Sequence, residues 1–487
     1  MEREVKAPLV QALSEYRQAE YYPCHFPAHK GGRAWPEFWR RLVENDLGAI
    51  DLTELPGLDD LHAPQGPIAR AQELTARLFG AGRSFFLVNG ATVGLVAALL
   101  GLCRPGEPVL IPRHGHRSLV SAAVLSGIRP VFLEGRVDRQ WGLPLGIDRE
   151  ELEAALARAP QARVLVAVYP TYEGAAYTLG PLVAFAHGHG IRVIVDEAHG
   201  AHFGRHRRFP PGALELGADV VVDGWHKTLG SLTQTAVLHL RPGLEEEEEE
   251  RIALALDLLQ TTSPSYPFLA SIDAMRARLA QEGPELWDEP LAVADEVRHC
   301  LERTFGLEVW EPEPPVKQDP LRVVVSAYYQ RGWSGRNLAA ALRERGRLQV
   351  EAWGERHVLL IFSLADGGQT AGRVKAAFAA ALQNPSAARE SLPAPDRGPG
   401  SYRWPSGGVL ALTPREAFLA PHRRLPLAAA AGKIAARPLV PYPPGIPFCW
   451  PGEVISNELV VWVQEWRSRG YSIQGVSREG EVMVVAG

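Results

Sequence analysis

The sequence is poor in cysteine, and the four cysteines that it has stand far apart. They are Cys24, Cys103, Cys300 and Cys449, and none belongs to a CxxC pair. This number and spacing argue against both a disulfide framework and a zinc site, so no metal site is predicted. A reducing compartment, the cytoplasm, is the simplest location for such a chain.

The sequence also lacks long apolar runs and an excess of either charge. Its longest apolar run, residues 91–103, is too short to span a membrane, and the N-terminal MEREVKAPLVQAL has no apolar core typical of a signal peptide. Lysine and arginine number 51 against 56 aspartates and glutamates, a net charge of -5. Because neither sign dominates, neither a nucleic acid nor a membrane is predicted as a partner.

The composition that remains is that of a folded α/β enzyme. Hydrophobic residues make up 46% and charged residues 22% of the 487 positions, which disfavours disorder, collagen and coiled coil. Glycine and proline, with 47 and 40 residues, exceed their average share and indicate many tight turns. At about 150 residues per domain, the length suggests roughly three folding units.

Unbroken β-branched runs alternate with helical stretches over the first half of the chain, a pattern typical of a parallel sheet covered on both faces. The predicted strands are 84–88, 108–111, 130–133, 163–169, 192–196 and 219–223. A smaller α+β pattern follows, and then a stretch rich in Pro, Gly and Ser. The predicted organisation is an N-terminal arm (1–40), a major domain (41–286), a small α+β domain (287–384), a linker (385–408) and a C-terminal domain (409–487).

Asp196 and Lys227 are the first candidates for chemistry. Asp196 ends one predicted strand and Lys227 follows the next, so both side chains should emerge at the carboxyl edge of the sheet, where open α/β sheets bind ligands. Alone, each residue is more often structural or solvated. Together they suggest pyridoxal phosphate (PLP), which needs a lysine amine for a Schiff base and a carboxylate that keeps its pyridine nitrogen protonated.

Two further segments at this sheet edge could serve the cofactor. Asn89–Thr92 lies between a predicted strand and a helix, whose N-terminal N–H groups and Thr92 hydroxyl suit a phosphate. A plain turn capped by Thr92 is the alternative. His116 follows the strand at 108–111 and could stack on the pyridine ring, although taken alone it is better interpreted as a surface histidine.

Longer motifs surround these residues. NGATVG (89–94), RHGHRS (113–118), DEAHGAHFG (196–204) and WHKTLGSLTQTA (225–236) resemble the cofactor motifs of the ornithine/lysine/arginine decarboxylases, PLP enzymes of the aspartate aminotransferase fold (fold type I). DEAHG alone occurs in many enzymes of that fold. Three segments are more specific to the decarboxylases: HFPAHKGG (25–32), DLTELPGLDDLHAPQGPI (51–68) and PYPPGIPFCWPGE (441–453). The similarity is closest to compact Gram-positive arginine or lysine decarboxylases, because no receiver-like domain precedes the core.

The resemblance implies a major PLP-binding domain with a mostly parallel sheet, a C-terminal decarboxylase-type domain, and a role for each site residue. Lys227 would form the Schiff base and Asp196 would meet the pyridine nitrogen. His116 and Ala198 would pack on opposite ring faces, and His226 would assist at the phosphate or in proton transfer, so Lys227, His226 and His116 form the catalytic set. The other implied cofactor contacts are Ala91, Thr92, His199, Thr261 and Thr262.

The chain departs from the family pattern beside the lysine. Family members often have a serine two or three residues before it as a phosphate ligand, whereas here Gly224 and Trp225 stand there, so that contact must come from elsewhere. The resemblance also suggests that TTSPSY (261–266) reaches the neighbour's phosphate across an interface, which implies a homodimer or a higher homo-oligomer. The loop PYPPGIP (441–447) is expected to line the entrance or to form a packing corner.

The implied reaction is PLP-dependent decarboxylation of a basic amino acid. Arginine, which gives agmatine, is favoured over lysine or ornithine, which give cadaverine or putrescine. The distal cation of such a substrate needs a carboxylate, and each candidate could equally be an exposed acidic residue. The candidates are Glu173 and Glu453 and, by family similarity, Glu54, Asp59 and Asp60.

Two other functions stay open. One is a different PLP enzyme of the same fold, such as an aminotransferase or an acyl-CoA-condensing synthase, against which HFPAHKGG and PYPPGIPFCWPGE argue. The other is a regulatory or scaffold homologue without cofactor, against which the intact set of Asp196, Lys227 and His116 argues.

Overall fold

The structure, a computed structural model, describes residues 16–45, 47–383, 407–442 and 445–486. Their contacts divide the chain into two compact units. The start of the predicted N-terminal arm, nearly all of the predicted linker and Pro443–Pro444 of the PYPPGIP loop lie outside the described residues. The smaller unit takes the described residues of Met1–Phe26, Trp287–Trp310 and Pro320–Asp396, and the larger unit those of Pro27–Leu286, Glu311–Asp319 and Arg397–Gly487.

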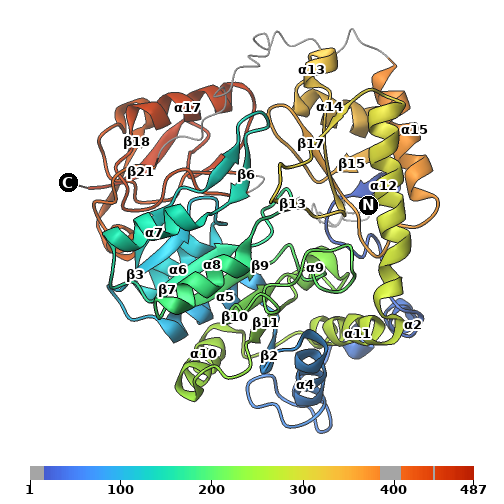
Figure 1. Cartoon of the computed structure of the whole chain (residues 1–487), viewed down its shortest axis with the longest axis horizontal. Coiled ribbons are helices and arrows are strands. Elements are labelled where there is room, and N and C mark those ends of the chain that lie inside the picture. Colours follow the sequence, from blue (N-terminus) through green and yellow to red (C-terminus); the bar gives the residue numbers. More distant parts are fainter. Residues whose placement is uncertain (1–15, 46, 384–406, 443–444, 487) are drawn as a thin grey trace, which may run out of the picture. The chain divides into compact units, whose positions relative to one another are not determined.

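A seven-stranded sheet forms the core of the larger unit (Figure 1). In spatial order its strands are β2 (Arg83–Leu87), β11 (Ala236–Leu240), β10 (Val220–Asp223), β9 (Arg192–Glu197), β7 (Val164–Val168), β3 (Pro108–Pro112) and β4 (Arg129–Leu133). The last five run parallel, and β11 is antiparallel to both β10 and β2. All six predicted strands are present, which confirms the α/β class.

Strand β11 is the one strand of this sheet that the sequence pattern did not predict. It follows β10 through the short helix α9 (Trp225–Thr228) and a loop, without the crossover helix that connects parallel strands. An alternation of strands and helices therefore gives no signal for it. Two other short pairings of the larger unit are β5 (Arg136–Asp138) with β6 (Leu143–Gly146) and β8 (Ala175–Ala176) with β13 (Lys317–Gln318).

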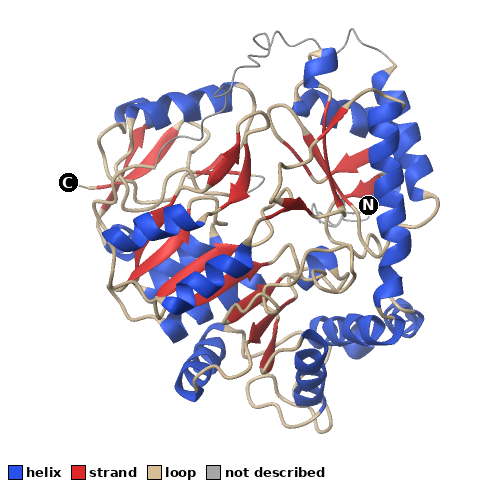
Figure 2. Ribbon diagram, in the orientation of Figure 1, coloured by secondary structure: helices blue, strands red, loops and turns tan. Residues whose placement is uncertain are grey.

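Helices cover the sheet, as the ribbons of Figure 2 show. Helix α5 (Gly90–Leu102) contains nearly all of the longest apolar run of the sequence. It contacts the sheet and two other helices, α6 and α10, and buries eight residues, so it is apolar on most of its sides. Among the described residues, none of the helices combines the length and the apolar character that crossing a lipid bilayer demands. The remaining helices of this part are α2 (Glu37–Asn45), α3 (Leu47–Ile50), α4 (Pro67–Phe79), α6 (Ser118–Ser126), α7 (Arg149–Arg158), α8 (Leu179–Gly188), α10 (Glu246–Leu259) and α11 (Tyr266–Glu282).

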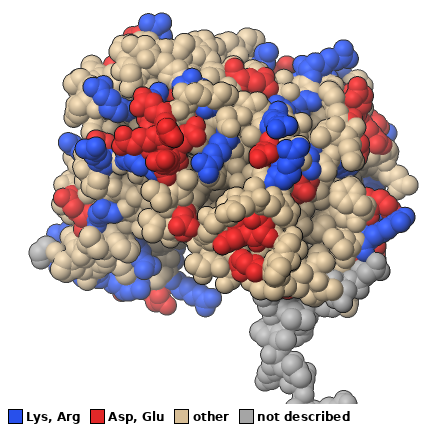
Figure 3. Space-filling model, turned by 90° about the horizontal axis from the view of Figure 1, so that it is seen from below, with Lys and Arg blue, Asp and Glu red and all other residues tan. Residues whose placement is uncertain are grey.

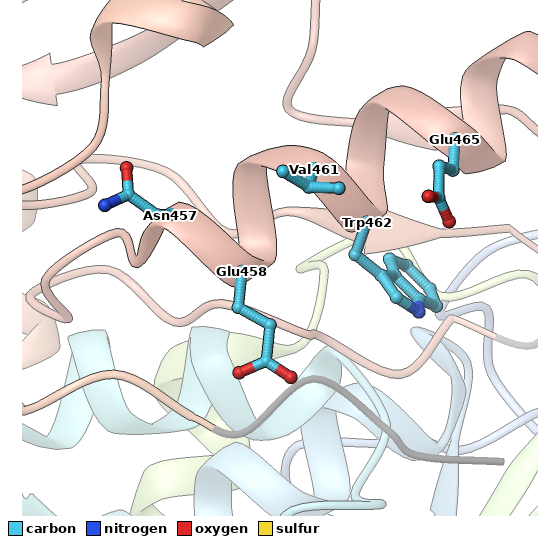
Figure 4. Close-up of a pocket in the computed structure, with 5 residues that line it drawn as sticks. All are labelled: Asn457, Glu458, Val461, Trp462 and Glu465. Atoms are coloured by element: carbon cyan, nitrogen blue, oxygen red, sulfur yellow. The ribbon is translucent and has the colours of Figure 1, made fainter. Parts of the chain in front are cut away.

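The C-terminal segment of the larger unit has its own apolar core, built from β-strand pairs and one long helix. Five residues of that helix line a surface hollow of about 320 Å³ (Figure 4), and none of them is a predicted site residue. The elements are α16 (Pro414–Leu419), β18 (His422–Pro426), η3 (Leu427–Ala429), β19 (Val440–Pro441), α17 (Asn457–Ser468), β20 (Ile473–Gln474) and β21 (Glu481–Val485), in which β18 pairs with β21 and β19 with β20.

The smaller unit consists of an antiparallel sheet with helices, and a parallel pair that includes the start of the described chain. Its sheet has the order β12 (Glu308–Val309), β14 (Arg322–Ser326), β17 (Val358–Ile361) and β16 (Ala352–Trp353). Strand β1 (Tyr22–Cys24) pairs with β15 (Leu348–Val350). The helices are α12 (Asp288–Arg303), α13 (Tyr328–Arg331), α14 (Gly335–Glu344) and α15 (Thr370–Leu382), and the 3-10 helix η1 (Pro284–Trp287) leads into this unit.

Charges of both signs lie on the face shown in Figure 3, in keeping with the small net charge. The acidic run that begins α10 is mostly exposed, and its negative charges suit the positive end of the helix dipole. One of its members, Glu248, pairs with Arg192 at the start of β9. The four cysteines are free thiols.

Candidate active site

Strands β9 and β10 bring Asp196 and Lys227 to the same end of the sheet. Asp196 is the penultimate residue of β9 and lies opposite Val222 of β10 in a parallel register. Lys227 lies on α9, and Gly224 is the single residue between the end of β10 and the start of α9. The structure places this lysine on a helix of one turn.

Gly224 allows the lysine segment to pack closely on the segment that follows β9. A Cβ atom at this position would lie 2.5 Å from the carbonyl oxygen of Ala198 and 3.2 Å from Cδ of Lys227. Because real Cβ atoms essentially never come this close to backbone, a serine here would push the two segments apart. At position 224 the departure from the family pattern therefore has a steric reason in this chain.

Asp196 is a buried carboxylate. The backbone N–H of Ala198 donates to its Oδ1 at 3.1 Å. Burial raises the pKa of Asp196, and the positive charge of Lys227 opposes that rise. A carboxylate in such surroundings is stabilised by a cationic partner, and a protonated pyridine nitrogen is one.

Three histidines surround Lys227. Its Nζ lies 3.0 Å from Nε2 of His199, whose ring packs edge-on against Tyr172 at 5.1 Å. Burial, followed by the charge of Lys227, lowers the pKa of His116 to about 4, and the same two causes lower the pKa of His226 to about 4. Both imidazoles are therefore neutral near pH 7, as a ring that stacks on the cofactor or accepts a proton must be.

The hydrogen bonds of these two histidines define their tautomers. The N–H of Ser118 donates to Nδ1 of His116 at 3.2 Å, so the proton of that ring lies on Nε2. In His226, Nδ1 donates to the carbonyl of Thr235 at 2.9 Å, which leaves Nε2 with the lone pair. The His226 carbonyl accepts from the N–H of Ala28, in the HFPAHKGG segment, at 3.0 Å.

Two decarboxylase-type segments thus reach the site, and they contribute residues that the sequence did not single out. His29 of HFPAHKGG is a partly buried histidine near His226, and burial lowers its pKa to about 4. Gly445 of PYPPGIP lies on His116, because a Cβ added to it would be 3.1 Å from Nε2. The family motifs contained both residues, but only the packing shows which member of each motif makes the contact.

The start of α5 follows β2, which runs in the same direction as β10 and so ends at the same edge of the sheet. Gly90 has a φ of +77° and turns the chain from β2 into the helix, so that Ala91 and Thr92 lie in its first turn. A helix of 13 residues presents unbonded N–H groups and a positive dipole end there, which suit a phosphate dianion. Thr261 lies beside this turn, since its N–H donates to Oδ1 of Asn89 at 3.2 Å, and Thr262 follows it on the exposed loop.

Glu453 has a different role from the expected contact with substrate. Its side chain is 0% exposed and pairs with Arg113, whose Nη2 lies 2.6 Å from Oε1. The N–H of Trp450 donates to its other oxygen at 2.7 Å. With its charge neutralised by Arg113, this carboxylate joins the C-terminal segment to the loop after β3 and is not available to a substrate cation.

Asp59 is likewise structural. Its carboxylate accepts hydrogen bonds from five backbone N–H groups between residues 60 and 69, two of them in the first turn of α4. These bonds outweigh the effect of burial and lower the pKa of Asp59. Glu54 is exposed and bonded to Thr53, and Asp60 accepts from the N–H of His62. Among the described residues, no three or more His, Cys, Asp or Glu side chains are grouped as a metal ion requires.

Glu173 is the remaining acidic candidate. It is buried in the loop between β7 and β8, with only 8% of its surface exposed. The loop turns tightly, because the N–H of Gly174 donates to the carbonyl of Thr171 at 2.9 Å. This carboxylate stays a prediction for the distal cation of a substrate.

A second buried acidic cluster lies on the other face of β9 and β10, because successive strand residues point to opposite sides. Glu197 and Asp223 are paired in the register, and Oδ2 of Asp223 lies 3.3 Å from Nε2 of His239. His239 in turn contacts Ser84 and stacks on Phe79. Burial, followed by the charge of Asp223, raises the pKa of Glu197 well above its ordinary value.

Solved structures with similar folds define the class of this protein. The constitutive lysine decarboxylase of Escherichia coli matches with a TM-score of 0.74 and 21% identity, over 98% of this chain and 82% of that one. A ureidoglycine-glyoxylate aminotransferase from Bacillus subtilis matches with a TM-score of 0.54 and 16% identity, over 65% of this chain and 84% of that one. The chain thus has the aspartate aminotransferase-like fold (fold type I), which confirms the predicted fold class.

The family follows from the sequence comparisons. The family model described as Orn/Lys/Arg decarboxylase, major domain, matches residues 7–320, and the one for the C-terminal domain matches residues 409–477. The chain therefore belongs to the Orn/Lys/Arg decarboxylase family. It is 36% identical to an arginine decarboxylase of Bacillus subtilis, over 96% of this chain and 95% of that protein, and 26% identical to the lysine decarboxylase LdcA of Pseudomonas aeruginosa, over 92% and 73%.

Proposed function

We propose that the protein is a PLP-dependent decarboxylase that acts on arginine. The observation that carries the proposal is the placement of Asp196 and Lys227 on adjoining segments at one end of the parallel sheet. Membership of the decarboxylase family supports the reaction, and the similarity to curated arginine decarboxylases along almost the whole chain supports the substrate. Lysine and ornithine are alternatives, since decarboxylases of both are more distant relatives.

The residues present fit PLP. Lys227 offers an amine, Asp196 a buried carboxylate for the pyridine nitrogen, and the first turn of α5 a set of donors for the phosphate. At Gly224 the segment that carries Lys227 packs closely against Ala198. When bound, PLP supplies a carbonyl that condenses with amines and a ring that accepts an electron pair.

The side chains of the chain then have separate tasks. Asp196 would pair with the protonated pyridine nitrogen of PLP. A buried carboxylate beside a positive charge costs less free energy than the same carboxylate alone. His116 offers a neutral ring, and His226 a lone pair on Nε2 that can hold a proton. Lys227 can deliver a proton to the substrate Cα once CO2 has left, either directly or through Nε2 of His226, which first accepts that proton.

Incubation with arginine, lysine and ornithine in separate reactions tests the substrate. We expect CO2 and agmatine from arginine, with cadaverine and putrescine formed more slowly from the other two amino acids. Mass spectrometry of the products distinguishes the outcomes. A keto acid in place of an amine would show an aminotransferase, and no product from any of the three would overturn the substrate class.

We also propose that the protein is a homodimer in the cytoplasm. The dimer is supported by an apolar surface on α10, where Leu254 and Leu258 are one turn apart and 62% and 83% exposed. We expect the mass of a dimer in sedimentation velocity, and a monomer when both leucines are replaced by glutamate. Leu419→Glu, at a leucine that is 72% exposed on α16, is the control and should sediment as the wild type does.

A further inference from the structure

His62 connects three segments of the larger unit. It lies in the loop between α3 and α4, within the DLTELPGLDDLHAPQGPI motif. Its Nδ1 is 2.5 Å from Oδ1 of Asp257 in α10, and its Nε2 is 2.9 Å from the carbonyl oxygen of Thr261, just beyond that helix. The side chain is only 17% exposed, so these two contacts account for both polar ends of the ring.

Both partners of His62 can only accept hydrogen bonds. A carboxylate and a peptide carbonyl carry no proton, so each ring nitrogen must donate one. This arrangement requires the doubly protonated imidazolium form. A neutral imidazole has a single N–H, and its second nitrogen would face an acceptor oxygen with lone pair against lone pair.

The residue that His62 holds lies against the start of α5. Thr261 accepts from His62 through its carbonyl and donates its N–H to Oδ1 of Asn89 at 3.2 Å. Asn89 immediately precedes the first residue of α5. One peptide segment is therefore held from two sides, by His62 and by Asn89, the residue just before the helix.

We propose that His62 is a positioning residue. As an imidazolium it donates to the carbonyl of Thr261 and holds that residue against Asn89, and this held contact is the clasp. The clasp helps the first turn of α5 to retain the phosphate of PLP, and deprotonation of His62 releases the segment. This inference rests on the proposed function, because that function places the phosphate at this helix start. His62 touches neither cofactor nor substrate in this account and acts through Thr261.

The charges around His62 determine the direction of the pH effect. Asp257 faces it from α10, and Asp60 and Glu54 face it from its own loop. Burial lowers the pKa of His62, but the hydrogen bonds to Thr261 and Asp257 and the charges of Asp257 and Asp60 outweigh it and raise the pKa above its ordinary value. The clasp is thus fully formed below the ordinary pKa of histidine, about 6.5, and is lost as pH rises through the higher folded-state value.

Amide hydrogen exchange on the full-length protein tests the clasp. Protection factors for the peptide that contains Thr261 and Thr262 are compared at about pH 6 and about pH 9, after correction for intrinsic exchange. In the wild type we expect protection to fall roughly three- to tenfold as pH rises, the loss of one charge-assisted hydrogen bond. His62→Gln, which does not titrate, should show no such fall, and His189→Gln, at an exposed histidine on α8's C-terminal end, should behave as the wild type.

Release of PLP from the loaded protein, followed by its visible absorbance, tests the link to the phosphate. We expect release to speed up with pH more steeply in the wild type than in His62→Gln. Equal pH dependence of amide protection in both would overturn the clasp. If the pH dependence of amide protection requires His62 but that of PLP release does not, the effect on the phosphate is overturned. If no variant binds PLP, the proposed function fails together with the phosphate effect, and amide exchange still decides the clasp.

Discussion

Replacing Lys227 with alanine is expected to abolish the visible absorbance of bound PLP and to lower turnover by roughly three orders of magnitude or more. The physical reason is that the amine of Lys227, on α9 just after β10, is the group that can hold the cofactor covalently. Alanine keeps the one-turn helix α9 intact, because the Lys227 backbone bond to Gly224 does not involve the side chain. Absorbance spectra and CO2 release measure the two effects.

Lys433→Ala provides the matched control. Lys433 is an exposed lysine in the C-terminal segment, so its loss removes one amine without touching the site. We expect unchanged colour and turnover. Yellow colour and CO2 release that persist in Lys227→Ala, with the circular dichroism of the wild type, would show that the lysine is wrongly assigned.

Replacing Arg113 with alanine should destabilise the fold by about 3–5 kcal/mol. Arg113 is the charged partner of Glu453, which is completely buried. Its guanidinium also lies over the ring of Phe132, 3.6 Å from the centroid, so that packing is lost as well. The midpoint of thermal unfolding measures the effect, and the change should be far larger than for a surface pair.

The pH dependence of this variant identifies the cause. Burial raises the pKa of Glu453 and Arg113 opposes the rise, so removing Arg113 raises it further. A carboxyl group whose pKa is higher in the folded chain than in the unfolded chain loses its proton more easily on unfolding. It therefore lowers the free energy of unfolding as the pH rises from the unfolded-state pKa to the folded-state pKa. The destabilisation should therefore grow with pH above about 4.5. The double variant Arg113→Ala/Glu453→Gln should recover part of the loss at neutral pH.

Arg149→Ala is the control for charge removal, because Arg149 pairs with Glu153 on the exposed surface of α7. Its cost should stay below about 1 kcal/mol. If Arg113→Ala unfolds at the same temperature as Arg149→Ala, then Glu453 needs no buried partner. In that case the carboxylate would again be a candidate for contact with the substrate.

The parallel sheet was predictable because its strands are buried on both faces. Val164–Val168 and Val220–Asp223 are fully buried, and such strands appear in the sequence as continuous β-branched runs. The same property made Asp196 stand out, as a carboxylate at the end of an apolar run. Strand β11 gave no comparable signal, since its position beside β10 depends on a tight return that only the folded chain shows.

The acidic residues show where sequence reasoning stops. Glu453, Asp59 and Glu173 looked alike as motif carboxylates, yet one pairs with Arg113 and another caps α4. Arg113 lies 340 positions from Glu453, whereas the N–H groups that bind Asp59 lie within ten positions of it. A carboxylate's role depends on what faces it, and residue spacing along the chain does not determine that.

The sequence by itself determined the fold class, the family, and the two residues, Asp196 and Lys227, around which the site is built. These follow from periodicity, strand ends and motifs, all of which are local along the chain. Only the tertiary structure decided the hydrogen bonds of the histidines, the close contact at Gly224, the buried pair of Glu453, and the contact of His62 with Thr261. The physical reason is that charge state and hydrogen bonding depend on burial and on partners brought together from distant parts of the chain.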